Sequence, residues 1–450
     1  MISTPIRDFA REYAASGAVR AHMPGHKGAP ILGCEPWDLT EVDGADELFA
    51  PRGIIAESEA NAGRLFGART LYSAEGSSLC IRAMAFLAAG RGRDGARPLI
   101  VAGRNAHKAF INACALVDAD VRWLRPAPGD SYHACTVTAA DVAAALADGA
   151  PCAVYLTSPD YLGNVTDIAP IAAVCRARGV PLLVDNAHGA YLKFLPGGSR
   201  HPIDLGADLC CDSAHKTLGA LTGAAYLHIR ADDAFGFADR ARDALALFGS
   251  TSPSYLILQS LDLVNPALKG LTARLAGFIP RVDALRARLT AHGFALRGDE
   301  PLKITLDAKR FGYTGDALAA RLRDAGVVCE FHDPDFVVLM LTPDNAPEDL
   351  ARVGDALTAI PPRPPLTGGA PAFRPLEQVL SPREARFAPM ETIPASACAG
   401  RVLCAANVGC PPAVPIAMCG ERMDAATAAR FAYYGIETCE VVKEMRKEDD

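Results

Sequence analysis

"DSAHKTLGALTG", residues 212–223, joins the end of an apolar run to a small, glycine-containing loop, and places a lysine directly after a histidine. A lysine in a short segment such as "SAHK", residues 213–216, is most often a solvated surface charge. Small neighbours around Lys216 nevertheless leave room for a ligand. An amine that is partly buried at the end of a strand is a nucleophile towards an aldehyde. The position of this lysine in the fold therefore decides between the two interpretations.

The sequence around this stretch alternates short apolar runs with segments of helical length. The runs are "RPLIVAG", "PCAVYLTS", "GVPLLVDNAHG", "DLCCDSAHK" and "GAAYLHIR". This alternation predicts βαβ units and an α/β fold with a mainly parallel sheet covered on both faces. Ligand groups gather at the carboxyl ends of such strands. Ser158, Asp185 and His107 fall at or shortly after strand ends, so we expect them in one crevice.

The pattern divides the chain into three parts. We expect a polar, glycine-rich N-terminal arm over residues 1–55, without strong periodicity. A large domain follows over residues 56–275, and a smaller α+β domain over residues 276–450. In that last part "RVDALRARLTAHGFAL" predicts a helix, "KITLDA" and "DFVVLMLT" predict strands, and "AIPPRPPLTGGAPAFRPL" predicts a connector.

Composition excludes several classes of function. Half of the 450 residues are hydrophobic and the net charge is -7, which gives no reason to expect a nucleic acid or an anionic membrane as partner. No apolar stretch is long enough to span a bilayer, so we expect a cytoplasmic protein. The fourteen cysteines have irregular spacing, which predicts reduced buried thiols and no metal site.

Three further features match the needs of a pyridoxal phosphate (PLP) enzyme. Asp185 ends an apolar run, where an aspartate either caps the next element or keeps a pyridine nitrogen protonated. Gly76, Ser77 and Ser78 precede a helical pattern, as an ordinary helix start or as a phosphate site. His107 follows a strand and suits stacking on a planar cofactor. With a lysine for the aldehyde, these features favour PLP.

Seven segments in chain order resemble the Orn/Lys/Arg decarboxylase family, which has the aspartate-aminotransferase fold. They are "AHMPGHKG", "DLTEVDGADELFAP", "RNAHKAF", "TSPDYLGNVTDI", "VDNAHGAY", "SAHKTLGALT" and "STSPSYLILQSLD". The likeness runs from Ala21 to Asp262, and more weakly through "GVVCEFHDPDFVVLMLTPDN". The chain resembles the short bacterial form without an N-terminal wing. This resemblance implies a PLP fold type I large domain with a mainly parallel sheet of the seven-stranded type.

The resemblance also implies roles for individual residues. Lys216 would bind the cofactor aldehyde covalently, Asp185 would hold the ring nitrogen, and Lys216 or His215 would return the proton. His107 would stack on the ring, and His188 would lie beside the cofactor. The phosphate would be held by Gly76, Ser77, Ser78, Ser213 and His215, and from the partner subunit by Ser250 with Thr251 beside it. Each site would then need two chains, which implies a homodimer and leaves assembly into a higher oligomer open.

Five positions depart from the usual family pattern: Asn186, Gly223, Glu75, Ile81 and Asp160. The residues expected to hold the cofactor are retained. The departures leave the substrate and the type of reaction open.

We therefore expect decarboxylation of a basic L-amino acid in polyamine-type metabolism, with arginine favoured before lysine and ornithine. Glu330 is the first candidate to meet the distal cation of the substrate, with Asp46 and Glu47 after it. The alternatives are another PLP reaction, either transamination or oxidative deamination in a specialised biosynthetic pathway, and a catalytically inactive binding or scaffold protein.

Overall fold

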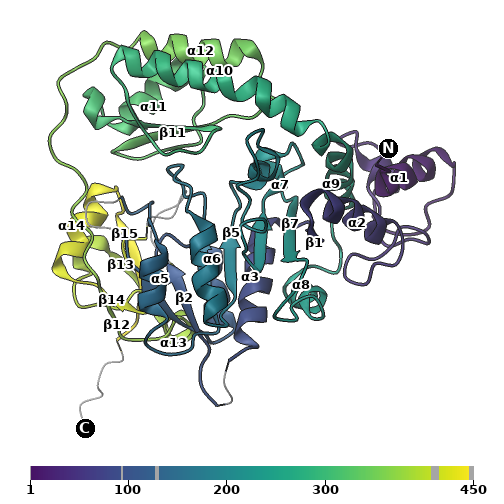
Figure 1. Ribbon diagram of the computed structural model, residues 1–450, viewed down its shortest axis with the longest axis horizontal. Coiled ribbons are helices and arrows are strands. Elements are labelled where there is room, and N and C mark those ends of the chain that lie inside the picture. The colour runs from purple at the N-terminus through teal and green to yellow at the C-terminus, as the bar shows by residue number, and fades with distance from the viewer. Residues whose placement is uncertain (1, 93–94, 127–130, 407–414, 445–450) are drawn as a thin grey trace. The chain divides into compact units, whose positions relative to one another are not determined.

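The computed structural model describes residues 2–92, 95–126, 131–406 and 415–444 (Figure 1). The chain forms two compact units. The first unit comprises residues 1–91, 152–158 and 167–276, and the second comprises residues 92–151, 159–166 and 277–450. The expected division into an arm, a large domain and a small domain stays a prediction.

A seven-stranded sheet confirms the predicted α/β fold. Its strand order is β1-β7-β6-β5-β4-β2-β3. The pairs β2/β3, β4/β5 and β5/β6 are parallel, whereas β7 runs antiparallel to both β6 and β1. The strands are β1 Ala68–Ser73, β2 Leu99–Gly103, β3 Asp120–Leu124, β4 Ala153–Thr157, β5 Leu182–Asp185, β6 Leu209–Asp212 and β7 Ala225–Arg230.

The strands that carry the predicted site are buried along their whole length. Every residue of β5 and β6 is buried, as expected for short apolar strands with both faces covered. Helix α3 packs on β1, β5, β6 and β7. Beyond its N-terminal part, the helices of this unit are α2 Ile54–Phe66, α3 Gly76–Ala89, α6 Ile168–Ala177, η2 Ala190–Phe194, α7 Ala214–Thr217, α8 Ala241–Phe248 and α9 Tyr255–Leu268.

The N-terminal part contains a helix that the sequence analysis did not predict. Helix α1 spans Pro5–Ala15 and η1 spans Glu35–Trp37. Ile6 and Ala10, one helical turn apart, are fully buried, and α1 packs against α2 and α9. Phe9 and Tyr13 extend this face at helical spacing and are half-buried, so the sequence carries a helical periodicity here, contrary to the expected arm without strong periodicity.

The second unit contains a four-stranded antiparallel sheet of order β10-β11-β9-β8. It confirms the two predicted strands of the C-terminal part. In Figure 1 helices α10 and α12 run side by side, and Arg288 of α10 contacts Asp355 of α12 over 2.8 Å. The elements are α4 Lys108–Leu116, α5 Ala139–Ala145, α10 Leu271–His292, which starts at the end of the first unit, β8 Ala295–Arg297, β9 Lys303–Asp307, η3 Lys309–Phe311, α11 Gly315–Asp324, β10 Phe331–His332, β11 Phe336–Met340 and α12 Pro347–Thr358.

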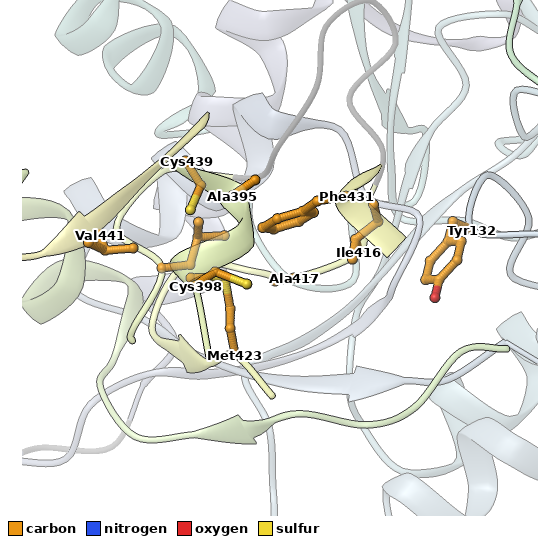
Figure 2. Close-up of a cluster of buried hydrophobic side chains, with 10 residues drawn as sticks. Tyr132, Ala395, Cys398, Ile416, Ala417, Met423, Phe431, Cys439 and Val441 are labelled. Carbon is orange, nitrogen blue, oxygen red and sulfur yellow. The ribbon is translucent and has the colours of Figure 1, made fainter. Parts of the chain in front are cut away.

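The segment after the predicted connector shares a hydrophobic core with Tyr132. Residues 361–376 contain neither helix nor strand. Beyond them, buried side chains including Leu403, Phe431 and Val441 pack together with Tyr132 (Figure 2). The elements are β12 Glu377–Gln378, α13 Pro382–Phe387, β13 Met390–Pro394, η4 Ala395–Ala397, β14 Glu421–Arg422, α14 Ala425–Tyr433 and β15 Thr438–Val442.

A buried ion pair joins this segment to the end of β2. The Arg104 guanidinium donates to both carboxylate oxygens of Glu421, over 2.6 and 2.7 Å. Both side chains are almost inaccessible to solvent. Helix α13 also packs on α4, the helix that follows β2.

Two expectations from composition can be compared with the described residues. Eleven of the thirteen cysteines there are buried free thiols, as predicted. None of the helices described is long and apolar enough to cross a membrane.

Candidate functional site

Lys216 lies where the sequence predicted it, immediately after a buried strand. Strand β6 ends at Asp212, and the short helix α7 carries Lys216 in its last turn. The Nζ atom of Lys216 lies 2.8 Å from Nε2 of His188, which follows the end of β5. The lysine is half-buried and His188 is buried. The structure thus brings together two of the predicted residues, one from each strand end.

Asp185 ends the neighbouring strand β5 and is only 2 % exposed. Its carboxylate accepts a hydrogen bond from the Tyr155 hydroxyl over 3.2 Å and from the backbone N–H of Ala187 over 3.1 Å. The Cys211 thiol lies 3.6 Å away. These three donors are neutral, so they orient the carboxylate while leaving its negative charge for a cationic ligand group.

The sequence predicts a phosphate site at the N-terminus of α3. Gly76 has a positive φ of 70° and no atom within 4 Å of the place where a Cβ would stand. Its N–H donates to the carbonyl of Gly223 over 2.7 Å, so Gly76 shapes the turn. The Glu75 side chain does not cap the helix, and Ser77 and Ser78 are half-buried. A helix start without a side-chain cap presents backbone N–H groups that suit an anion.

Ser213 and His215 flank the start of α7. The Ser213 hydroxyl is fully buried and has no hydrogen-bond partner among the described residues. His215 donates from Nδ1 to the carbonyl of Ala224 over 2.9 Å. Burial lowers the pKa of His215 more than this hydrogen bond raises it. A neutral His215 with its hydrogen on Nδ1 leaves Nε2 as an acceptor.

Ser250 and Thr251 are exposed. Ser250 lies near the start of α3 of its own chain. The backbone N–H of Ser250 donates to the Glu75 carboxylate over 2.6 Å. Glu75 directly precedes Gly76, so the "STSPSY" segment lies beside this chain's own α3 N-terminus.

Two predicted residues belong to the second unit. His107 is the N-cap residue of α4, and its Nδ1 accepts from the backbone N–H of Ala109 over 3.2 Å. Glu330 is exposed and accepts a hydrogen bond from the Tyr161 hydroxyl over 3.2 Å. It lines a cavity of about 310 Å³ together with Arg323.

The other two candidates for the substrate cation lie in the N-terminal part. Asp46 has a positive φ of 70°, and its carboxylate accepts backbone hydrogen bonds from Arg52, Gly53 and Ile55 at the start of α2. Burial opposes ionisation, yet these backbone donors lower the pKa of Asp46. The local contacts of Asp46 are those of a helix-capping residue, whereas Glu47 is exposed.

The sequence analysis missed a buried network around Asp212. Its Oδ2 accepts from Nε2 of His201 over 2.9 Å and from Nε2 of His228 over 3.1 Å. Its Oδ1 accepts from the Asn186 amide over 2.6 Å. Although burial alone would raise it, the two imidazoles hold the pKa of Asp212 below its usual value. His201, Cys210 and Asp212 have the residue types of a metal site, but their contacts here are hydrogen bonds.

The described residues of the first unit fit PLP. The group needs an amine for its aldehyde, a carboxylate for its ring nitrogen and donors for its phosphate. Lys216 and Asp185 would supply the first two. The Ser213 hydroxyl, buried without a partner in the described part of the chain, and the uncapped start of α3 would supply the third.

Comparison with solved structures identifies the fold. The constitutive lysine decarboxylase of E. coli superposes with a TM-score of 0.74 at 19 % identity, covering 98 % of this chain and 82 % of that one. Lysine decarboxylase A from Pseudomonas aeruginosa gives a TM-score of 0.76 at 17 % identity, covering 98 % and 80 %. The chain therefore has the fold of these lysine decarboxylases.

A family model described as Orn/Lys/Arg decarboxylase, major domain, matches residues 4–293. The chain therefore belongs to the Orn/Lys/Arg decarboxylase family of amino-acid decarboxylases, and the family implies PLP as the cofactor. Among curated relatives, the arginine decarboxylase of Bacillus subtilis is 28 % identical over 93 % of this chain and 91 % of its own length. That of Halalkalibacterium halodurans is 28 % identical over 96 % and 92 %.

Proposed function

We propose that this protein uses PLP to decarboxylate a basic L-amino acid, with arginine favoured before lysine and ornithine. The observation that carries the proposal is the 2.8 Å contact between Lys216 Nζ and His188 Nε2, beside the strand that Asp185 ends. The relatives named arginine decarboxylase, which match over 91 % and 92 % of their own lengths, support arginine. A role in polyamine-type metabolism and a cytoplasmic location stay predictions.

Each residue has a defined task in this proposal. When bound, PLP supplies an electron sink for the bond that breaks at the substrate Cα. Lys216 would hold the aldehyde and Asp185 the ring nitrogen, while the start of α3 and Ser213 would hold the phosphate. At 2.8 Å, Lys216 Nζ and His188 Nε2 are close enough to share a proton.

His215 has a narrower task than the sequence analysis gave it. Because Nδ1 donates to Ala224 and burial keeps the ring neutral, Nε2 accepts a hydrogen bond or a proton. We therefore favour Lys216 over His215 as the group that returns a proton to the product. His107 remains proposed to stack on the ring, and Glu330, Asp46 and Glu47 remain candidates for the substrate cation.

The test measures both products. The protein is loaded with PLP and incubated with arginine, lysine and ornithine in turn, and CO₂ and amine are measured. We expect equal amounts of both, and loss of both in Lys216→Ala but not in Lys269→Ala, which changes an exposed lysine. A keto acid or peroxide without CO₂ would establish transamination or oxidative deamination instead. Protein that stays colourless with PLP would establish an inactive scaffold.

We further propose a homodimer in which Ser250 and Thr251 reach the phosphate of the partner subunit. Ser250→Asp would bring a carboxylate to the phosphate, and Lys216→Ala removes the amine. Co-expressed, the two inactive variants would form mixed dimers with one intact site. Activity well above that of either variant alone supports shared sites, and no gain would show that each chain builds its own site.

A further inference from the structure

The loops that follow β5 and β6 are joined at two levels. At their outer ends, Lys216 Nζ lies 2.8 Å from His188 Nε2. Beneath that contact, the Asn186 amide donates to Asp212 Oδ1 over 2.6 Å, and both residues are fully buried. Asn186 precedes His188 by two residues, and Asp212 precedes Lys216 by four. The buried hydrogen bond therefore joins the two loops that carry the lysine and its histidine.

The acceptor of this hydrogen bond is fixed in place. Asp212 Oδ2 accepts from the Nε2 atoms of His201 and His228, which are both fully buried. Nδ1 of His201 accepts from the backbone N–H of Ile203 over 3.4 Å, so the hydrogen of His201 is on Nε2. The carboxylate cannot rotate without breaking an imidazole hydrogen bond. Oδ1 is therefore an acceptor in a constant position.

Position 186 carries an amide although the amide oxygen makes no hydrogen bond within the described part of the chain. The Oδ1 atom of Asn186 is buried and has no hydrogen-bond partner among the residues the structure describes. A buried acceptor without a partner destabilises the fold, and an apolar residue would avoid this cost. An acidic residue would place two carboxylates against each other. The donor atom Nδ2, aimed at Asp212, is what distinguishes asparagine from both.

We propose that Asn186 and Asp212 are a positioning pair that sets the distance between His188 and Lys216. The inference rests on the proposed function of Lys216 and adds two residues that act on it through their loops. Without the buried hydrogen bond, the β5 loop loses its connection to the β6 loop. His188 then no longer holds its place beside the amine, and the protonation of that amine changes.

The experiment uses four variants of the full chain. Asn186→Ala removes the donor, and Asn186→Asp sets two carboxylates together. The double variant Asn186→Asp with Asp212→Asn restores an amide–carboxylate hydrogen bond in the opposite direction. Asn265→Ala is the matched control, because Asn265 is also fully buried and donates to Ser58 and Tyr72, away from both loops.

Three quantities are measured on PLP-loaded protein: the pH midpoint of the cofactor absorbance change, kcat with KM, and the unfolding temperature. A first measurement separates this proposal from the one it rests on. Wild-type protein must show an absorbance band that Lys216→Ala lacks. Absence of that band contradicts the proposed function itself.

We expect both single Asn186 variants to shift the midpoint and to lower kcat about tenfold or more, with little change in KM. The double variant should recover the midpoint and most of kcat. Asn265→Ala should lower the unfolding temperature alone. The proposal is overturned if the Asn186 variants behave like this control, or if the double variant is no better than Asn186→Asp. Should the single variants fail to fold, the double variant decides: a wild-type midpoint supports the pair, and a shifted midpoint or an unfolded protein overturns it.

Discussion

Asp185 and Asp212 end adjacent strands of one sheet, yet their carboxylates have different surroundings. Asp185 pairs in register with Cys211, so Asp212, the next residue, points to the opposite face. On its face Asp185 meets a phenol, a backbone amide and a thiol. On the other face Asp212 is enclosed by two imidazoles and an amide. We therefore expect Asp185 to meet a ligand and Asp212 to support the fold.

The largest effect that tests this contrast is expected at Asp185. Asp185→Asn keeps the shape and the contact with Tyr155 but removes the charge that would meet the cofactor. We expect kcat/KM to fall about 100-fold to 1,000-fold, by analogy with the loss of one preorganised electrostatic contact, while the apoprotein stays folded. Steady-state kinetics and circular dichroism measure the two properties. An apoprotein that unfolds would remove the distinction between the two carboxylates.

The next effect is expected at Asp212 and concerns stability. Asp212→Ala leaves two buried imidazoles and the Asn186 amide without their acceptor. The free energy of unfolding should fall by about 3–5 kcal/mol, the usual loss when one partner of a buried charged group is removed. Urea unfolding of the apoprotein measures this, with Asp185→Ala alongside as control. Equal losses in the two variants would mean that both carboxylates are structural.

A third buried carboxylate adds a pH dependence. Asp262 on α9 accepts from the Ser58 hydroxyl and the backbone N–H of Arg7, and burial raises the pKa of Asp262 to about 6. The folded chain thus binds this proton more tightly than the unfolded chain, whose pKa is near 3.8. The stability that protonated Asp262 contributes to the folded chain is complete below about pH 4 and is lost as the pH rises through about 6.

Asp262→Asn removes the titration and keeps one of the two acceptor oxygens, so the cost of the lost acceptor contact is the same at every pH. Between pH 4 and pH 7, the free energy of unfolding of the variant should rise by about 3 kcal/mol relative to that of the wild type, at about 1.36 kcal/mol for each pKa unit. Chemical unfolding at several pH values gives the difference. A constant difference across that range would show that Asp262 stays ionised, as Asp212 does.

The smallest effect is expected at one of the neutral donors to Asp185. Tyr155→Phe removes the hydroxyl that donates to Asp185 over 3.2 Å. We expect the free energy of unfolding to fall by about 1 kcal/mol, the typical net value of one hydrogen bond. We expect kcat/KM to fall by less than about tenfold. Kinetics and thermal unfolding give both values. A fall as large as that of Asp185→Asn would mean that Tyr155 itself contacts the cofactor.

The sequence predicted the candidate residues whose position follows from a local pattern. Lys216 and Asp185 each end or follow a buried strand, and Gly76 opens helix α3, so a short stretch of sequence was enough to place each of them. The Asp212 network was missed because its partners are far away along the chain: His201 lies 11 residues off, His228 16 and Asn186 26. Only the assembled sheet brings them together.

The fold also explains why some positions depart from the usual family pattern. A Cβ on Gly223 would stand 3.0 Å from the carbonyl oxygen of Ala74, and the carbonyl of Gly223 holds the N–H of Gly76. Asn186 faces a carboxylate, which an acidic residue there would repel. Asp160 uses its carboxylate to close its own turn, accepting from Leu162 and Asn164. Nothing in the structure explains Ile81 beyond its burial in α3.

The ion pair between Arg104 and Glu421 has a consequence for any shortened version of this protein. A chain that stopped within the Pro/Gly-rich connector would leave Arg104, at the end of β2, without its carboxylate partner. It would also lose the core that Tyr132 shares with Phe431 and Val441. The segment after the connector is therefore part of the fold, and a truncation at the connector would uncover the end of β2, which leads to His107.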